Sequence, residues 1–114
     1  MWSIAEYTDH VREVLFGMRF LLDAALTQPG TDLGESPPQQ FASRPRQIDI
    51  EAALDGIDHE ASSLSQQLSG LSSHDWFLTV RFDGTSVDPH WIACHAVHDA
   101  THHLLDIVRL CSAL

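Results

Sequence analysis

The stretch 49–71, DIEAALDGIDHEASSLSQQLSGL, decides the fold class of this chain. Its apolar residues alternate in steps of four and three, the pattern of a helix that packs one stripe against other helices. The stripe consists of Ile50, Leu54, Ile57, Ala61, Leu64, Leu68 and Leu71. Asp49 suits the cap at the start of such a helix and Gly70 suits its end. The stretch therefore predicts a helix over about 50–69 that belongs to an all-α bundle.

A second helical pattern precedes this stretch. Ser3 and Glu6 have the S-x-x-E spacing of a capping box, which marks the start of a helix. Apolar residues then recur at helical intervals in the residues that follow. Pro29 and Gly30 cannot continue a helix, so we expect this helix to end near Thr27.

The residues 29–46, which connect these two helices, are rich in proline, glycine, serine and glutamine. Connections of this length are usually functional lids or mobile links. Arg44 and Arg46 form a basic pair within it, and we interpret them either as a contact for an anionic ligand or as solvated residues.

The region 72–87 is the part of the chain with strand character. Its segment WFLTVRF, residues 76–82, favours β structure, and Asp83 and Gly84 form a turn signal directly after it. We expect an extended segment or a short hairpin that crosses the bundle here, and not a sheet.

A last helix follows, because Asp88 suits its cap and Pro89 its first position. No residue interrupts its pattern before Leu114. The sequence thus predicts one domain, 1–114, an all-α up-down helical bundle with three long helices and a short extended segment before the last helix.

The charge of the chain excludes several classes of partner. Its formal net charge is −10, with six basic residues of which none is lysine. A chain without a basic face repels nucleic acids and anionic membrane surfaces. No run approaches the roughly 20 apolar residues of a membrane span, and the first residues, MWSIAEYTDH, do not resemble a signal peptide. We therefore expect a cytoplasmic protein without nucleic-acid or membrane partners.

The two cysteines, Cys94 and Cys111, are expected to be reduced thiols packed within the last helix. A rise of about 25 Å along one helix separates them, which is too far for a disulfide.

Histidines are the most informative local feature. Four of the eight histidines lie within nine residues of the last helix, namely His95, His98, His102 and His103. His98 and His102 are four residues apart, a spacing that places two imidazoles on one helical face, one turn apart, where they can reach one metal ion. We expect this pair to point at the bundle interior, and His103 to face outward or towards a neighbouring helix.

A metal site needs a third ligand, usually from another helix. His10 lies on the apolar stripe of the first helix and is expected to point inward, which makes it the candidate, with Glu6 as a substitute. His95 is interpreted as a fourth ligand, a partner of a ligand, or a packing residue. His59, His74 and His90 are expected to be surface residues.

Two segments resemble one superfamily. The segment 2–11, WSIAEYTDHV, resembles the part of DinB-like proteins that carries their first metal-ligand histidine. The segment 95–107, HAVHDATHHLLDI, resembles their closing helix with its H-x-x-x-H pair. This superfamily includes damage-inducible proteins, mycothiol-dependent maleylpyruvate isomerases and bacillithiol transferases. The resemblance implies a four-helix bundle and a Zn²⁺ or Ni²⁺ centre with His10, His98 and His102 as ligands and open positions for water or thiolate.

The chain departs from the family in one respect. Family members usually have a helix before the W-S-x-x-E segment, whereas in this chain that segment begins at Trp2. A bundle without that helix exposes an apolar groove, at a cost of about 25 cal/mol per Å² of apolar surface. We expect a second copy to fill the groove and form a homodimer.

Two functions from different classes follow. The first is a metal-dependent thiol transferase, isomerase or hydrolase that acts on a small molecule, with a metal-bound water or a low-molecular-weight thiol as the nucleophile. Its candidate general acids or bases are Glu6, His95 and Asp99. The alternative is a non-catalytic metal- or ligand-binding dimeric helical module. In such a module a fourth protein ligand occupies the coordination position that an enzyme leaves open. A metal-free dimeric module with a histidine-rich core is the third possibility.

Overall fold

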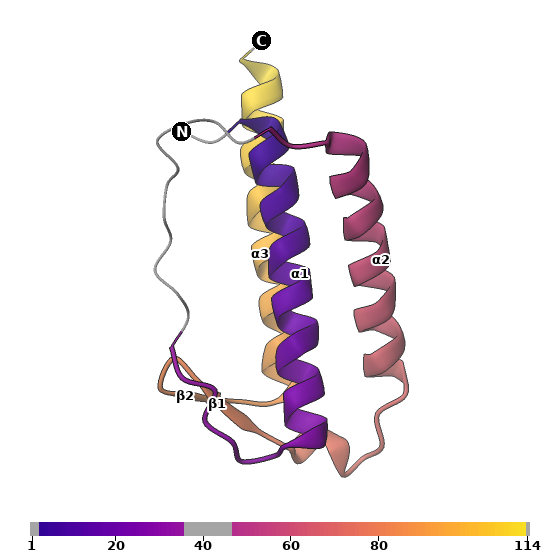
Figure 1. The fold of residues 1–114 in the computed structure, drawn as a ribbon, viewed down its shortest axis with the longest axis vertical. Coiled ribbons are helices and arrows are strands. Elements are labelled where there is room, and N and C mark those ends of the chain that lie inside the picture. The colour runs from indigo at the N-terminus through magenta and orange to yellow at the C-terminus, as the bar shows by residue number, and fades with distance from the viewer. Residues whose placement is uncertain (1–2, 36–46, 114) are drawn as a thin grey trace.

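The computed structural model describes residues 3–35 and 47–113, and within them three long helices (Figure 1). These helices are α1 (Ile4–Thr27), α2 (Ile50–Ser69) and α3 (Pro89–Ser112). A 3-10 turn, η1 (Asp75–Phe77), and two short strands, β1 (Val80–Phe82) and β2 (Thr85–Val87), lie between α2 and α3. The predicted helical architecture is confirmed, and the segment before the last helix is a hairpin. The hairpin forms a two-stranded sheet, so the expectation of no sheet is wrong. Arg44 and Arg46 lie outside the described residues.

The predicted starts of all three helices are confirmed, because each is set by a local hydrogen bond. The Ser3 hydroxyl accepts a hydrogen bond from the Glu6 backbone N–H, and the Glu6 carboxylate accepts one from the Ser3 N–H, each at 3.2 Å. Asp49 accepts from the Ala52 N–H at 3.2 Å. Asp88 accepts from the Trp91 N–H at 2.8 Å. Each carboxylate or hydroxyl thus satisfies a donor that the first helical turn leaves free.

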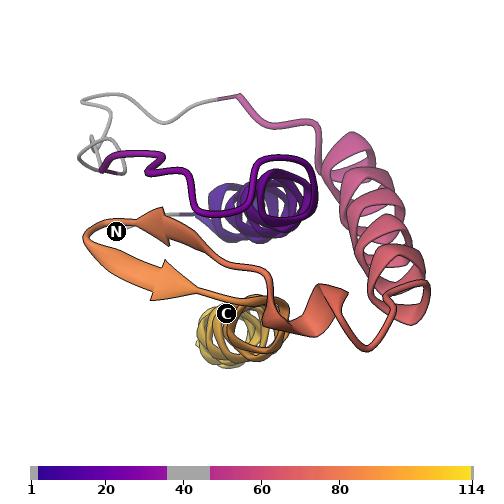
Figure 2. The same cartoon turned by 90° about the horizontal axis from the view of Figure 1, so that it is seen from below.

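The helix α1 is the centre of the molecule, and α2 and α3 pack on two different sides of it (Figure 2). The contacts between helices run mainly from α1 to α2 and from α1 to α3. An ion pair between Arg19 of α1 and the largely buried Glu60 of α2 fixes the first of these contacts. Gly56 of α2 lies where the aliphatic part of Arg12 crosses it, and an added Cβ there would collide with the Arg12 Cδ.

The hairpin closes the lower end of the helices. Val80 and Val87 face each other across its two strands, and both are fully or almost fully buried, at 0% and 1% exposure. Asp83 and Gly84 both have positive φ, at 51° and 74°, which suits the two-residue turn of a right-twisted hairpin. The backbone of Thr31 and Leu33 bonds to Arg81, so the residues after α1 run along β1.

The core lies where the three helices and the hairpin meet. Leu22 of α1 and Ile92 of α3 are completely buried there. Further along the molecule, α2 and α3 diverge and leave a groove whose floor is α1. Its lining residues carry no charged group: Ile4, Thr8, Val11, Leu15, Ile50, Leu54, Ile57, Ala61, Leu64, Ser65, Leu68, Ser69, Ala93, Ala96, Val97, Ala100, Leu104 and Ile107. We call this surface the α2–α3 groove.

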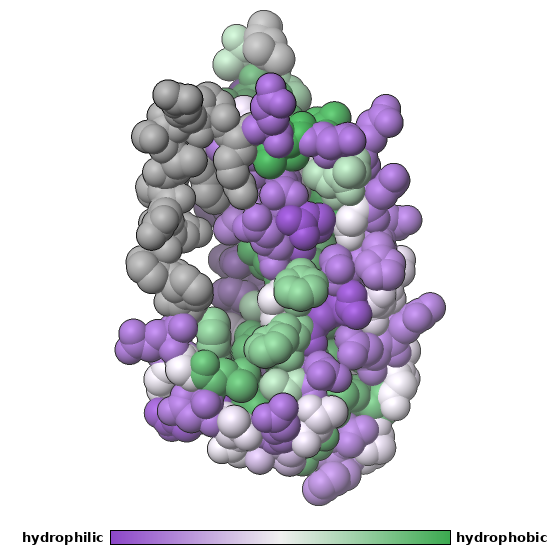
Figure 3. All heavy atoms as spheres, viewed as in Figure 1, coloured by the Kyte–Doolittle hydropathy of each residue, from purple (hydrophilic) through white to green (hydrophobic). Residues whose placement is uncertain are grey.

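The outer surface is mixed in character. The face in Figure 3 carries polar groups over α2 and an apolar area over the lower half of the molecule. The large exposed apolar side chains of α1 are Phe16 and Phe20, at 56% and 58% exposure. Among the described residues, none of the helices combines the length and the apolar character that crossing a membrane requires.

Candidate metal centre

The buried side of α3 is not the side that carries His98 and His102. Ile92 and Ala96 face α1 and are buried, at 0% and 3% exposure, whereas His98 and His102 are exposed. The prediction that this pair points at the bundle interior is therefore wrong.

The reason is that α3 has two apolar stripes. One consists of Ile92, Ala96 and Ala100, whose small alanines allow α1 to approach closely, and it packs against the core. The other includes Leu105 and Val108, which are exposed at 50% and 58%. The periodicity of apolar residues alone does not decide between two such stripes, and packing against α1 selects the one with the smaller side chains.

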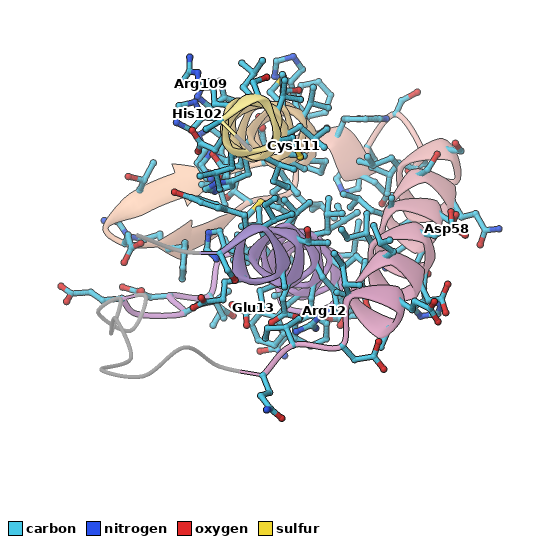
Figure 4. The ribbon with its side chains drawn as sticks, turned by 90° about the horizontal axis from the view of Figure 1, so that it is seen from above. Arg12, Glu13, Asp58, His102, Arg109 and Cys111 are labelled. Carbon is cyan, nitrogen blue, oxygen red and sulfur yellow. The ribbon has the colours of Figure 1, made fainter. Side chains whose placement is uncertain are left out.

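The pair itself has the geometry of a helical i, i+4 chelate. The rings of His98 and His102 are nearly parallel, at 10°, and their centres are 6.4 Å apart. Figure 4 shows His102 on the side of α3 that is turned away from α2. The surface around the pair is shallow and formed by α3 alone. Its lining residues are Ala93, Cys94, Val97, His98, Thr101, His102 and Leu105. We call this surface the α3 outer face.

His10 does point inward as predicted, but its neighbour is His103. The two rings meet edge to face, with centres 4.6 Å apart, and the His10 side chain is only 16% exposed. His103 also lies 5.9 Å from the ring of Tyr7, so it contacts α1, the second of the two orientations predicted for it. Burial lowers the pKa of His10 from 6.5, and the neighbouring His103 lowers it further, while Glu13 and Asp99 act in the opposite direction.

The three predicted ligands are therefore not gathered at one point. His103 contacts both His10 and the pair, since its ring centre is 4.6 Å from that of His10 and 5.9 Å from that of His102. Within residues 3–35 and 47–113, no group of three or more histidine, cysteine, aspartate or glutamate side chains is arranged to hold one metal ion. In this conformation the pair offers a metal two ligands from one chain.

The candidate general acids and bases have other partners. The Glu6 carboxylate is 8% exposed and caps α1 at the Ser3 N–H. His95 stacks on Trp91, with ring centres 4.5 Å apart, and its Nε2 lies 3.1 Å from Asp99 Oδ2. Asp99 thus orients His95 rather than His98 or His102.

One arrangement was not recognised from the sequence. His90, Cys94, His98 and His102 follow one another at intervals of four residues along α3, and all four are exposed. We call this row the ligand ladder. The Cys94 Sγ lies 3.8 Å from the His90 Nε2. Because Cys94 is exposed, the expectation of a packed thiol at this position is wrong. The sequence feature that indicates this row is the repeated spacing of four residues from His90 to His102.

Two further expectations for these residue types are confirmed. His59, His74 and His90 are surface residues, and both cysteines are free thiols. Cys111 is exposed like Cys94, which corrects its expected packing. Comparison with models of protein families, with curated proteins and with solved structures finds no match for this chain.

Proposed function

We propose that this protein is a helical module that binds a divalent transition metal through His98 and His102 of α3. The observation that carries the proposal is the exposed pair of imidazoles one helical turn apart, with ring centres separated by 6.4 Å. Two such imidazoles on one face of a helix are the arrangement by which H-x-x-x-H sequences chelate metals.

The separation of the rings is close to what a shared metal requires. Two imidazoles that bind one tetrahedral ion through nitrogens about 2.0 Å away have ring centres about 5 Å apart. The observed separation of 6.4 Å has to shorten by about 1.4 Å to reach that value, together with a rotation of the two rings towards a common point. Both side chains are exposed, and the His102 ring contacts the ring of His103 at a centre-to-centre distance of 5.9 Å. Imidazole nitrogens suit Zn²⁺ and Ni²⁺, which are the metals we propose.

The geometry supports metal binding better than the metal-dependent thiol transfer, isomerisation or hydrolysis that the DinB-like resemblance implies. Such an enzyme gains from a site that excludes water and holds an acid or base beside the metal. The α3 outer face is shallow, and Glu6, His95 and Asp99 are engaged elsewhere. We therefore favour a non-catalytic metal-binding module over an enzyme that acts on a small molecule.

His10 remains the proposed third ligand if the centre forms within one chain. For that, its ring has to leave His103, against which it is packed at 4.6 Å. A metal held by His98 and His102 without His10 requires no such change in the core.

Calorimetric titration of untagged protein with Zn²⁺ and Ni²⁺ tests the proposal. We expect His98→Ala and His102→Ala each to weaken binding by at least tenfold. The control His59→Ala removes an exposed histidine of α2 and should bind as the wild type does. Unchanged affinity in both α3 variants would refute the assignment. A large loss in His10→Ala would instead support the three-histidine centre of one chain.

A further inference from the structure

We propose that a second copy of this chain completes the metal site, so that one ion is held by His98 and His102 from each of two chains. This inference rests on the proposed function. It adds the partner, the stoichiometry and the surface through which two copies meet.

The histidine pair of one chain supplies fewer ligands than a zinc ion usually has. Zinc in proteins is almost always bound by three or four protein ligands in a tetrahedral arrangement. The α3 outer face supplies two, and no third histidine, cysteine or carboxylate joins them within the described residues. The site therefore needs ligands from elsewhere. A second copy brings two identical imidazoles and completes a four-nitrogen shell.

The surface around the pair is free of acidic and basic residues. The α3 outer face carries no aspartate, glutamate, lysine or arginine, although the chain has 16 acidic and six basic residues. Asp99 and Asp106 of the same helix are paired with His95 and His103 instead. Two chains of charge −10 repel each other over most of their surfaces. This uncharged face is one along which they can approach.

The α3 outer face also exposes large apolar side chains beside the pair. Val97 and Leu105 flank the two histidines and are exposed at 67% and 50%. Contiguous exposed apolar surface that is rimmed by polar residues typically marks an interaction site. Val97 also lines the α2–α3 groove, so a helix lying along the α3 outer face also covers the adjacent wall of that groove. The dimer proposed here thus joins α3 to α3 and differs from the homodimer expected from the sequence, in which the second copy fills the apolar groove.

Two-fold symmetry then decides which side chains meet. In a closed dimer the same patch is used by both chains. Two antiparallel copies of α3 that cross at the level of Ala100 place His98 of one chain opposite His102 of the other. Helices in contact have axes 8–10 Å apart, a gap that imidazoles from both sides span together with the ion. Four nitrogens then surround a single ion on the two-fold axis.

The ligand ladder offers an alternative crossing point, which the structure disfavours. A crossing one turn earlier would pair Cys94 with His98 and give a site of two thiolates and two imidazoles. The Cys94 Sγ is already in contact with His90, at 3.8 Å from its Nε2. The α3 outer face extends from Ala93 to Leu105, so its middle lies at the level of the histidine pair.

Sedimentation velocity of the full chain with increasing Zn²⁺ is the test. We expect a monomer in the presence of a chelator and a dimer on addition of half an equivalent of Zn²⁺ per chain, reversed by the chelator. His98→Ala and His102→Ala should each stay monomeric at the same Zn²⁺ concentration. The matched control His90→Ala removes an exposed histidine of α3 that does not line the α3 outer face, and it should dimerise as the wild type does. Cys94→Ser, which keeps a side chain of similar size on that face, tests for a thiolate ligand and should also dimerise.

Each other outcome contradicts a defined part of the account. One Zn²⁺ bound per monomer, lost in His98→Ala, would overturn the shared site and leave the proposed function standing. No Zn²⁺ bound in any form would overturn both. A dimer that forms in chelator and persists in His98→Ala would place the interface elsewhere, with the α2–α3 groove as the first candidate. Loss of the dimer in Cys94→Ser would replace the four-histidine site by one that contains thiolate. Circular dichroism of each variant verifies that it is folded.

Discussion

The His10 side chain of α1 packs against His103 of α3, at a position where a positive charge is unfavourable. Burial is the main cause of its lowered pKa, and the adjacent His103 adds to it. Glu13 lies 3.8 Å from the His10 Nδ1, and its charge, like that of Asp99, opposes the shift only in part. The neutral imidazole is thus the form that the folded chain accommodates.

A pH dependence of stability follows from this shift. Because the pKa of His10 is lower in the folded chain, the unfolded chain binds more protons as the pH falls below its unfolded value of about 6.5. The contribution of His10 is therefore fully present above that pH and decreases as the pH falls through it. In urea titrations with a chelator present, the free energy of unfolding should fall between pH 7.5 and 5.5, and His10→Gln should reduce the fall. His59→Gln should leave it unchanged, and an equal reduction in both variants would contradict the role of His10.

At the scale of the element, α3 begins where Asp88 satisfies the Trp91 N–H, at 2.8 Å. Asp88→Ala removes this acceptor and should lower the free energy of unfolding by about 1 kcal/mol. Asp88→Asn retains a side-chain oxygen and should lose only a small part of that amount. Thermal and urea denaturation of the two variants makes the comparison. Equal losses would mean that the charge of Asp88, rather than its hydrogen bond, stabilises the start of α3.

The packing of α1 gives a second prediction at this scale. Leu22 is 0% exposed, and Leu22→Ala should cost about 2–5 kcal/mol because a cavity replaces most of the side chain. Phe20→Ala changes a larger side chain of the same helix that is 58% exposed. That change should stay within about 0.5–1 kcal/mol. Urea titration distinguishes the two, and a larger loss for Phe20→Ala would show that this face of α1 is covered in solution.

The elements differ in how far the sequence predicted them. The starts at Ser3, Asp49 and Asp88 were predicted correctly because a cap acts on donors within its own helical turn. The hairpin turn at Asp83 was equally local. The rotation of α3 about its axis is not local, because it depends on which apolar stripe fits the surface of α1. His98 and His102 were therefore identified as an i, i+4 pair but assigned to the wrong side of the helix.

At the scale of the whole molecule, net charge governs the association of two copies. Two chains of charge −10 repel each other at low ionic strength, and salt screens this repulsion over a Debye length of about 10 Å at 0.1 M. The dimer that we propose has an uncharged contact, so added salt weakens the repulsion without breaking an ion pair. The zinc-dependent dimer should therefore become several-fold tighter between low and moderate sodium chloride, as followed by sedimentation. A dimer that salt weakens would indicate a contact made by opposite charges.

X-ray absorption at the zinc edge tests the central claim most directly, because it reports the atoms bound to the ion. In the wild-type protein loaded with half an equivalent of Zn²⁺ per chain, we predict a shell of imidazole nitrogens at about 2.0 Å and no sulfur. The imidazole signal should disappear in His98→Ala. A sulfur shell at about 2.3 Å, or an imidazole signal that persists unchanged in His98→Ala, would contradict binding by His98 and His102.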